Sequence, residues 1–155
     1  GLRRWRTDLR IEKKIVMRTD SVQNEIIEEF SMFEDWLDKY DYLISLSDSL
    51  PVIDPAHKSE QYIIEGCQSR VWVDARLEDG KVYYSADSDA IIVKGILALL
   101  IRAMQGRTPQ QILDLDLYFI EEIGLQENLS PTRGNGVVST IKQMRLFALA
   151  FSSTK

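Results

Sequence analysis

The sequence predicts an α+β fold in which a small antiparallel sheet of about three strands packs against several helices. Three observations lead to this prediction. Apolar residues recur at the period of a helix face in the first and last parts of the chain, they alternate with polar residues in the middle, and an Asp-Gly pair separates two alternating segments. With 155 residues, 45% of them hydrophobic, the chain is long enough for one domain with a proper core.

Residues 21–50 predict two helices that pack as a hairpin. Ser21 is expected to cap the first helix, a break near residues 31–35 separates the two, and Pro51 ends the second. The polar, proline-containing stretch 51–61 that follows predicts a loop. The apolar stripes are Val22, Ile26, Ile27, Phe30 and Phe33 in the first helix and Trp36, Tyr40, Leu43 and Leu50 in the second.

The central part of the chain changes to the period of a β-strand. In residues 70–77 every second side chain is apolar and faces one way, which predicts a half-buried strand. The pair Asp79-Gly80 predicts a two-residue hairpin turn, and residues 81–86 then return as a second strand. Residues 61–66, just before the only cysteine, predict a third strand.

Helices resume after the sheet. Residues 87–106 are apolar nearly all round and predict a core helix that lies on the sheet. Its expected capping residues are Asp87, Ser88 and Asp89 at the start and Gly106 at the end. Two short helices are predicted over residues 108–124, the first of them capped by Thr108, and a long one is expected to begin after its cap, Ser130. The apolar stripe of this last helix consists of Val137, Ile141, Met144, Ala148 and Phe151.

The charge of the chain is unevenly distributed. Residues 1–20 hold seven Lys or Arg and three acidic residues, whereas the rest of the chain holds 12 basic and 21 acidic residues. A body this acidic is a poor binder of phosphate backbones, so nucleic acid is not an expected partner. No apolar run reaches the length of a membrane span, so a membrane is not an expected partner either. We expect residues 1–20 to be a basic N-terminal extension or a segment upstream of the natural start, and residues 21–155 to form the functional domain.

Cys67 is the only cysteine, which excludes an intramolecular disulfide. It stands between Gly66 and the polar pair Gln68-Ser69. A free cysteine is most often an inert core residue, but this setting indicates a loop tip that offers the thiol to another molecule. A single thiol of this kind can attack sulfur as a thiolate and hold a covalent adduct. Two alternatives stay open: a non-catalytic adaptor with an inert core thiol, and a cysteine hydrolase in which His57, the only histidine, is the base.

A glycine-containing segment opens the last helix. Residues 130–136 place Gly134 and Gly136 in its first two turns, where each glycine costs about 1 kcal/mol relative to alanine. Glycine in such a position usually permits close approach by another group. Arg133 in the first turn opposes the helix dipole. We therefore expect Arg133 to act on a group outside its own helix, either a carboxylate or a thiolate.

Four segments together resemble the SufE/CsdE family of cysteine desulfuration proteins. They are IIEGCQSRVWV at residues 63–73, SADSDAIIVKGILALL at 85–100, RTPQQIL at 107–113 and ENLSPTRGNGVVSTIKQMR at 127–145. The resemblance runs from about residue 22 to the end and leaves residues 1–20 outside it. It implies a fold similar to that of IscU-type scaffold proteins, with a small antiparallel sheet and helices.

The resemblance also implies a sulfur acceptor. Members take sulfur as a persulfide from a pyridoxal-phosphate-dependent cysteine desulfurase of the SufS/CsdA type, stimulate that enzyme, and pass the sulfur to the SufBCD scaffold for iron–sulfur cluster assembly. Such a protein is a carrier and activator rather than an independent enzyme. It needs no metal and no cofactor of its own, because pyridoxal phosphate belongs to the partner, and the expected compartment is the cytoplasm.

The residues that match the family's motifs lie around the thiol. The resemblance implies that the thiol is shielded in the free protein and exposed on docking. The expected site residues are Cys67 as the reactive group, and Gly66, Gln68, Ser69, Asp89 and Arg133 in the thiol loop or on the surface that faces the partner.

Overall fold

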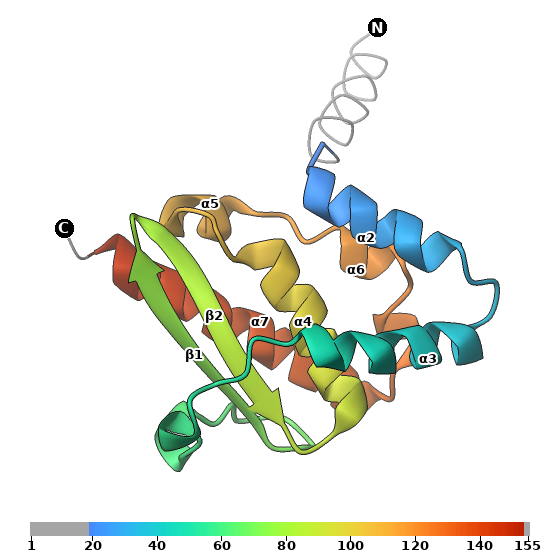
Figure 1. Ribbon diagram of the computed structural model, residues 1–155, viewed down its shortest axis with the longest axis horizontal. Coiled ribbons are helices and arrows are strands. Elements are labelled where there is room, and N and C mark those ends of the chain that lie inside the picture. Colours follow the sequence, from blue (N-terminus) through green and yellow to red (C-terminus); the bar gives the residue numbers. More distant parts are fainter. Residues whose placement is uncertain (1–18, 154–155) are drawn as a thin grey trace, which may run out of the picture.

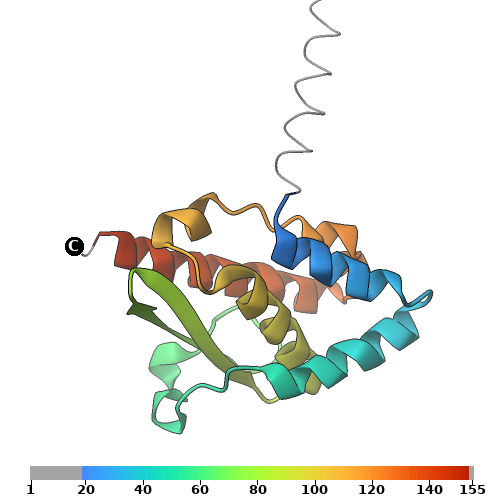
Figure 2. The ribbon, with the colours of Figure 1, turned by 45° about the horizontal axis from the view of Figure 1, so that its top comes forward.

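The computed structural model describes residues 19–153. Its sheet consists of two antiparallel strands, β1 (Val71–Glu78) and β2 (Lys81–Ser88). Helix α4 (Ile91–Met104) lies between this hairpin and the first two helices of the described chain (Figures 1 and 2). The α+β class predicted from the sequence is confirmed. The N-terminal extension predicted over residues 1–20 lies almost wholly outside the described residues.

Helices α2 (Ser21–Ser31) and α3 (Trp36–Leu46) follow each other as expected. They touch through Phe30 and Tyr42, and both pack on α4. The cap of α2 is Asp20 and not Ser21, because the Asp20 carboxylate accepts two backbone N–H bonds of the first turn, at 3.0 and 3.1 Å. Aspartate and serine are about equally good caps. The prediction therefore missed the boundary by one residue.

Strands β1 and β2 pair in the predicted register. Glu78 lies opposite Lys81, so Asp79 and Gly80 form the two-residue turn. Val71 and Val73 of β1 are buried as their spacing predicts, whereas Leu77, at the turn end of the same apolar stripe, is 40% exposed.

The third strand predicted over residues 61–66 is reduced to a single β-bridge between Ile63 and Trp72. The preceding residues, Glu60–Tyr62, form a 3₁₀ turn, and the chain turns again directly before the cysteine. Only a very short piece of extended chain remains between these two turns. The expected strand is therefore too short to form, and the sheet has two strands in the described part of the chain.

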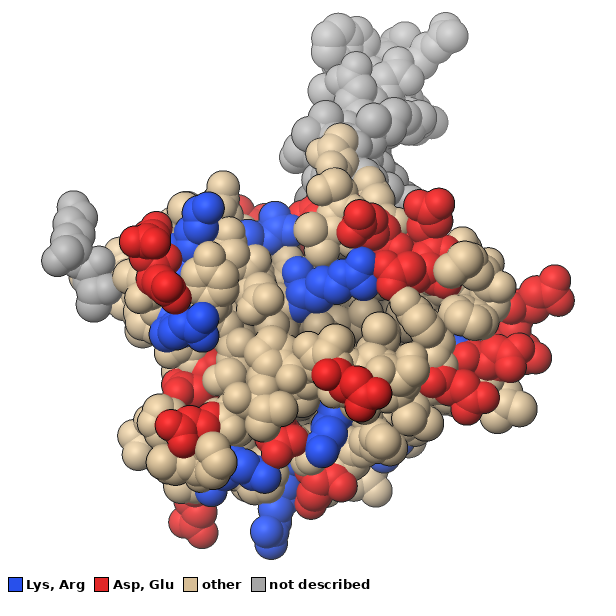
Figure 3. Space-filling model, viewed as in Figure 1, with Lys and Arg blue, Asp and Glu red and all other residues tan. Residues whose placement is uncertain are grey.

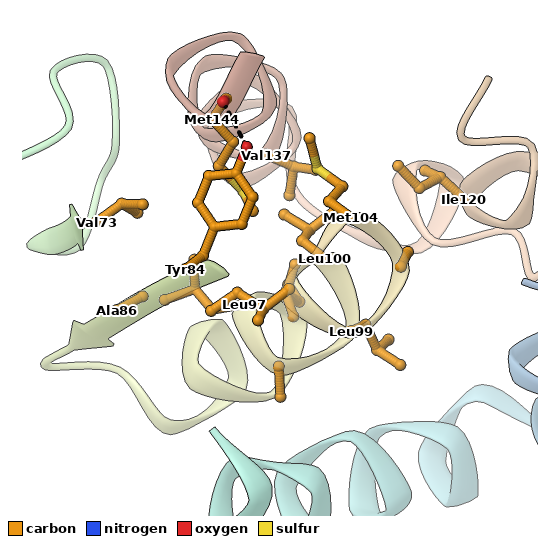
Figure 4. Packing of buried hydrophobic residues seen from close by; sticks show 14 of the residues in the cluster. Val73, Tyr84, Ala86, Leu97, Leu99, Leu100, Met104, Ile120, Val137 and Met144 are labelled. Carbon is orange, nitrogen blue, oxygen red and sulfur yellow. Dashed lines mark hydrogen bonds between the residues drawn. The ribbon is translucent and has the colours of Figure 1, made fainter. Parts of the chain in front are cut away.

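The core is built around α4, whose residues from Gly95 to Ile101 are all buried. Tyr84 of β2 reaches past α4 to the last helix, where its hydroxyl donates to the Met144 carbonyl at 2.7 Å (Figure 4). Figure 4 also shows Leu97 and Leu100 of α4 on the side of Tyr84 that faces this helix. The sheet, α4 and the last helix thus share one apolar core.

Three further helices follow in the predicted order: α5 (Pro109–Asp114), α6 (Phe119–Glu122) and α7 (Pro131–Ser152). Thr108 and Ser130 are the expected N-caps of α5 and α7, and each accepts a backbone N–H bond from its first turn. The 22-residue α7 packs along both α5 and β1. Its first turns therefore lie beside the segment that carries the cysteine.

Acidic side chains gather on the side of the molecule formed by α2 and α3 (Figure 3). Exposed members of this group are Glu25, Glu28, Glu34, Asp35, Asp38 and Asp41. Within residues 19–153, no helix combines the length and the apolar character needed to cross a bilayer. The same residues contain no cluster of His, Cys, Asp and Glu side chains that could hold a metal ion.

Candidate thiol site

Cys67 lies in a loop of residues 65–70, called the thiol loop below. Gly66 in this loop has a φ of 87°, which residues with a side chain rarely adopt. A Cβ atom at Gly66 would also lie only 2.9 Å from the Ser139 hydroxyl on α7. Glycine is therefore needed here both for the turn and for the close packing of the loop on α7.

Hydrogen bonds hold both ends of the thiol loop. Before it, the Ile64 N–H donates to the Val71 carbonyl at 2.8 Å. After it, the Arg70 N–H donates to the Asp89 carboxylate at 3.1 Å, and the Arg70 carbonyl accepts the Asp89 N–H at 3.3 Å. The Ser88 hydroxyl donates to the same carbonyl at 2.7 Å. Asp89 thus fastens the end of the loop to the β2–α4 connection.

The residues expected to cap α4 have other partners, and this corrects the prediction. One of them, Asp89, holds the thiol loop. The carboxylate of Asp87 instead accepts a hydrogen bond from Lys58 at 2.9 Å. The N-cap itself is Ala90, which has no capping side chain, and its N–H donates to the Ser88 hydroxyl at 3.2 Å. The reason is that β2 extends through Ser88, so the helix begins later than the sequence suggests.

The Cys67 side chain is partly buried and turns toward α7. Its Sγ lies 3.6 Å from the Gly136 carbonyl, to which the thiol donates, and 3.9 Å from the Thr140 hydroxyl. Burial raises the pKa of the Cys67 thiol above its ordinary value, and the hydrogen bond with Thr140 has a smaller effect in the opposite direction. At neutral pH the sulfur is therefore a thiol in this arrangement.

The thiol faces a small cavity of about 20 Å³ between the loop, α4 and the start of α7. This volume is enough for about one water-sized atom. Its apolar walls are Val71, Val93, Ile96, Leu97, Leu100 and Val137, and its polar lining residues are Gln68, Ser69, Arg133 and Thr140. The structure thus places Gln68, Ser69 and Arg133 in the lining of the cavity beside the thiol. Gly66 and Asp89 shape the loop instead of lining the cavity.

Gly136 allows the thiol loop to lie close to α7. A Cβ atom at this position would meet Sγ of Cys67 at 3.4 Å and its Cα at 3.5 Å, and would fill the space beside the thiol. Nothing lies within 4 Å of a Cβ atom at Gly134. The expected close approach is therefore present at Gly136 and absent at Gly134.

Arg133 brings a positive charge to the cavity. Its Nε is buried and has no hydrogen-bond partner among the described residues. Leaving such a donor unpaired costs about 1–3 kcal/mol. The Nε of Arg133 is therefore available to hydrogen-bond a group outside the described residues.

His57 does not lie beside the thiol. Its Nδ1 is 2.6 Å from a carboxylate oxygen of Asp74, and its ring stacks on that of Tyr62 with 4.8 Å between centroids. His57 is not among the residues that line the Cys67 cavity. Because it is the only histidine in the chain, the structure gives no support to a Cys67–His57 hydrolase pair.

Sequence reasoning missed Thr140. This residue is only 3% exposed, and its hydroxyl donates to the Gly136 carbonyl at 2.8 Å. A signal for it was available, because Thr140 follows Arg133 by two helical turns and Gly136 by about one, so the three share a helix face. A hydroxyl on a buried helix face needs a partner, which for Thr140 is the Gly136 carbonyl.

The fold has a counterpart among solved structures. The solution structure of a hypothetical protein from Thermus thermophilus matches this chain with a TM-score of 0.72, over 87% of this chain and 98% of that one. The two sequences are 22% identical. This likeness defines the fold class alone.

Sequence comparisons identify the family within that class. The SufE family model, described as an Fe-S metabolism associated domain, matches residues 24–148. An uncharacterized SufE-like protein of Synechocystis sp. is 41% identical over 127 residues, which are 82% of this chain and 80% of that protein. SufE-like protein 1, chloroplastic/mitochondrial, of Arabidopsis thaliana is 37% identical over 81% of this chain but only 34% of its own length. The chain belongs to the SufE family, and membership supports a role in iron–sulfur metabolism and, in general terms, in sulfur transfer.

Proposed function

We propose that this protein is a sulfur acceptor in which Cys67 receives sulfur from the persulfide of a cysteine desulfurase of the SufS/CsdA type. The observation that carries the proposal is that the only thiol of the chain faces a cavity with room for one more atom. A second thiol nearby would release the sulfur by forming a disulfide. The chain has no second cysteine that could do so.

The transfer step is an exchange between two thiolates. The Cys67 thiolate attacks the outer sulfur of the donor's persulfide, and a new S–S bond forms at Cys67 while the donor's S–S bond breaks. The donor cysteine leaves as a thiolate. No atom is oxidised or reduced overall, and the proton that Cys67 loses goes to the departing thiolate or to water.

The resting geometry requires a movement before this attack. Burial keeps Cys67 in its thiol form and turned toward α7, whereas attack needs an exposed thiolate. We infer that docking of the desulfurase turns the thiol loop outward. The hydrogen bonds at Ile64 and Asp89 restrict this movement to the residues between them, and Gly66 is the natural pivot.

The cavity then suits the carried sulfur. When the loop returns, the outer sulfur of a Cys67 persulfide fits the volume beside the thiol, next to the apolar walls of the cavity. Arg133 supplies a positive charge and an unpaired N–H donor at the same place. Charge-assisted hydrogen bonds are about twice as strong as neutral ones, so this donor favours the anionic form of the persulfide.

The partners and the setting are part of the proposal. Removing sulfur from the desulfurase frees that enzyme for another turnover, so the protein acts as an activator. We propose that the SufBCD scaffold receives the sulfur and that pyridoxal phosphate belongs to the desulfurase. We also propose that the protein acts in the cytoplasm. The name of the Arabidopsis relative assigns that protein to chloroplast and mitochondrion.

Mass spectrometry tests this function directly. The protein is incubated with a SufS-type desulfurase, pyridoxal phosphate and cysteine, and the peptide that contains Cys67 is analysed without reductant. We expect it to gain the mass of one sulfur atom. Cys67→Ser should still bind the desulfurase but gain no sulfur, and His57→Ala should load like the wild type. A wild-type peptide that stays unmodified while the desulfurase carries its persulfide would exclude the proposed function.

A further inference from the structure

A hydroxyl and a thiol share one acceptor beside the cavity. The Gly136 carbonyl accepts the Thr140 hydroxyl at 2.8 Å and faces the Cys67 thiol at 3.6 Å. The Thr140 oxygen and the Cys67 sulfur are themselves 3.9 Å apart. Thr140 is only 3% exposed, so bulk water does not compete for its hydroxyl.

This arrangement stabilises the protonated thiol of Cys67 and destabilises its thiolate. A thiol can donate to the carbonyl, whereas a thiolate only accepts and is repelled by the carbonyl oxygen. The cavity residues from β1 and α4 are apolar, and those from the loop, Gln68 and Ser69, are uncharged. Arg133 on α7 is the one charged residue in the cavity lining, apart from the cysteine itself when it ionises. Ionisation of Cys67 therefore requires help from either Arg133 or Thr140.

We propose that Thr140 is a switching hydrogen-bond donor for Cys67. In the resting protein its hydroxyl hydrogen points to the Gly136 carbonyl, a bond that threonine often makes within helices. When Cys67 becomes a thiolate, the hydrogen rotates toward the sulfur. Rotation about the Cβ–Oγ1 bond moves only a hydrogen atom, and Gly136 keeps its helical bond from the Thr140 N–H. The inference rests on the proposed function, in which this thiolate is the attacking group.

The Thr140 hydroxyl has a partner both before and after the thiol loop moves outward. As the loop begins to leave, a thiolate that is still near α7 receives the hydroxyl bond in place of the unfavourable carbonyl. When the loop has left, Thr140 returns to Gly136, so no buried hydroxyl remains unpaired. The direction of the Thr140 effect on the Cys67 pKa, which is downward, agrees with this role.

The test is the pH profile of Cys67 alkylation by iodoacetamide, measured by intact mass on the full chain. The midpoint of this profile reports ionisation of the thiol, and the plateau at high pH reports its accessibility. We expect Thr140→Val to raise the midpoint of the profile by about one pH unit. Thr140→Ser keeps the hydroxyl and should react within about twofold of the wild type.

Thr132→Val is the matched control, because Thr132 is an exposed residue of the same helix and does not line the cavity. It should leave both the midpoint and the plateau unchanged. Equal midpoints for Thr140→Val and the wild type, or a change in the plateau alone, would overturn the proposal. If circular dichroism shows that Thr140→Val does not fold, Thr140→Ala is compared with Thr140→Ser by the same criterion.

This result is separable from the proposed function because alkylation needs no desulfurase. A shifted midpoint in Thr140→Val, with no sulfur loading of the wild type, would support the donor role and reject the sulfur acceptor. Normal loading of the wild type together with equal midpoints in all variants would reject the donor role alone.

Discussion

Two regions next to the hairpin β1–β2 differ in whether their polar groups have partners. On one face, Asp74 pairs with His57, and Asp87 lies 2.9 Å from Lys58 and 3.6 Å from Lys94. This outer polar cluster fastens the segment that leads into the thiol loop. On the other face, the cavity contains a buried Arg133 Nε without a partner and a thiol whose pKa is raised by burial.

The difference separates charges that are paired within the protein from groups that are left without a partner. Burial acts to raise the pKa of Asp87, but hydrogen bonds from Lys58 and the Ser88 N–H, together with the charges of Lys58 and Lys94, bring it below its usual range. That carboxylate is satisfied and has nothing further to bind. At the cavity the protein keeps a donor unpaired at a free-energy cost. Such a cost is reasonable where a ligand or a reacting group completes the arrangement.

The largest effect is expected when one cation of each region is replaced, Arg133 at the cavity and Lys58 in the outer polar cluster. Arg133→Gln removes the unpaired guanidinium, and we expect the rate of sulfur loading from a desulfurase to fall about tenfold. Its free energy of unfolding should stay the same or rise slightly, because an unsatisfied buried donor is lost. Lys58→Gln should do the reverse, with loading within about twofold and stability lower by about 0.5–1 kcal/mol. Loading assays and urea unfolding measure the two quantities in each variant. Equal loss of loading in the two variants would show that the two regions do not differ in function.

A second comparison uses the carboxylate that holds the thiol loop, Asp89, and one carboxylate of the outer polar cluster, Asp74. Asp89→Ala removes the bond to the Arg70 N–H, so the thiol loop opens more often. We expect the plateau of the Cys67 alkylation profile to rise about fivefold, in proportion to the open population. Asp74→Asn changes the carboxylate that pairs with His57 and should leave the alkylation plateau unchanged. Hydrogen exchange of the loop amides provides an independent measurement, and unchanged exchange in Asp89→Ala would contradict the role of Asp89.

The parts of the fold that depend on neighbouring residues could be predicted from the sequence. Periodicity and caps such as Thr108 and Ser130 correctly predicted the helices, and the Asp-Gly pair predicted the hairpin. The third strand was wrong because a short apolar run does not show where the chain turns. The direction of the Cys67 side chain depends on a contact with Gly136, 69 residues away, which no local pattern contains. The family resemblance connected Arg133 with the thiol, but it did not point to Thr140.

The two glycines of α7 give a third and smaller comparison. Alanine at either position should stabilise the helix by up to about 1 kcal/mol, since glycine is the poorer helix former. Only Gly136→Ala places a methyl group against Cys67, at 3.4 Å from Sγ. We expect it to slow sulfur loading about threefold because it fills the cavity, whereas Gly134→Ala should load normally. Similar loading by both variants would show that the cavity volume is unimportant.

The smallest expected effect is on stability at alkaline pH. The Cys67 pKa is higher in the folded protein than in the unfolded chain, so folding favours the protonated thiol. This contribution is complete below the unfolded value of about 8.5 and is lost as pH rises toward the folded pKa. The unfolding free energy of the wild type, measured relative to Cys67→Ser, should therefore decline above about pH 8.5. A difference that stays constant with pH would mean that burial does not perturb the thiol.

The size of the cavity has a consequence for chemical selectivity. A space of about 20 Å³ admits a single atom but not a tripeptide. If Cys67 carries a persulfide, as proposed above, a bulky thiol such as glutathione would reach the outer sulfur less readily than a small one, whereas a large, shape-matched protein that draws the loop outward would reach it freely. The lifetime of the cargo would then depend on how often the loop opens, and discharge to the wrong acceptor would be rare without any recognition of the sulfur itself.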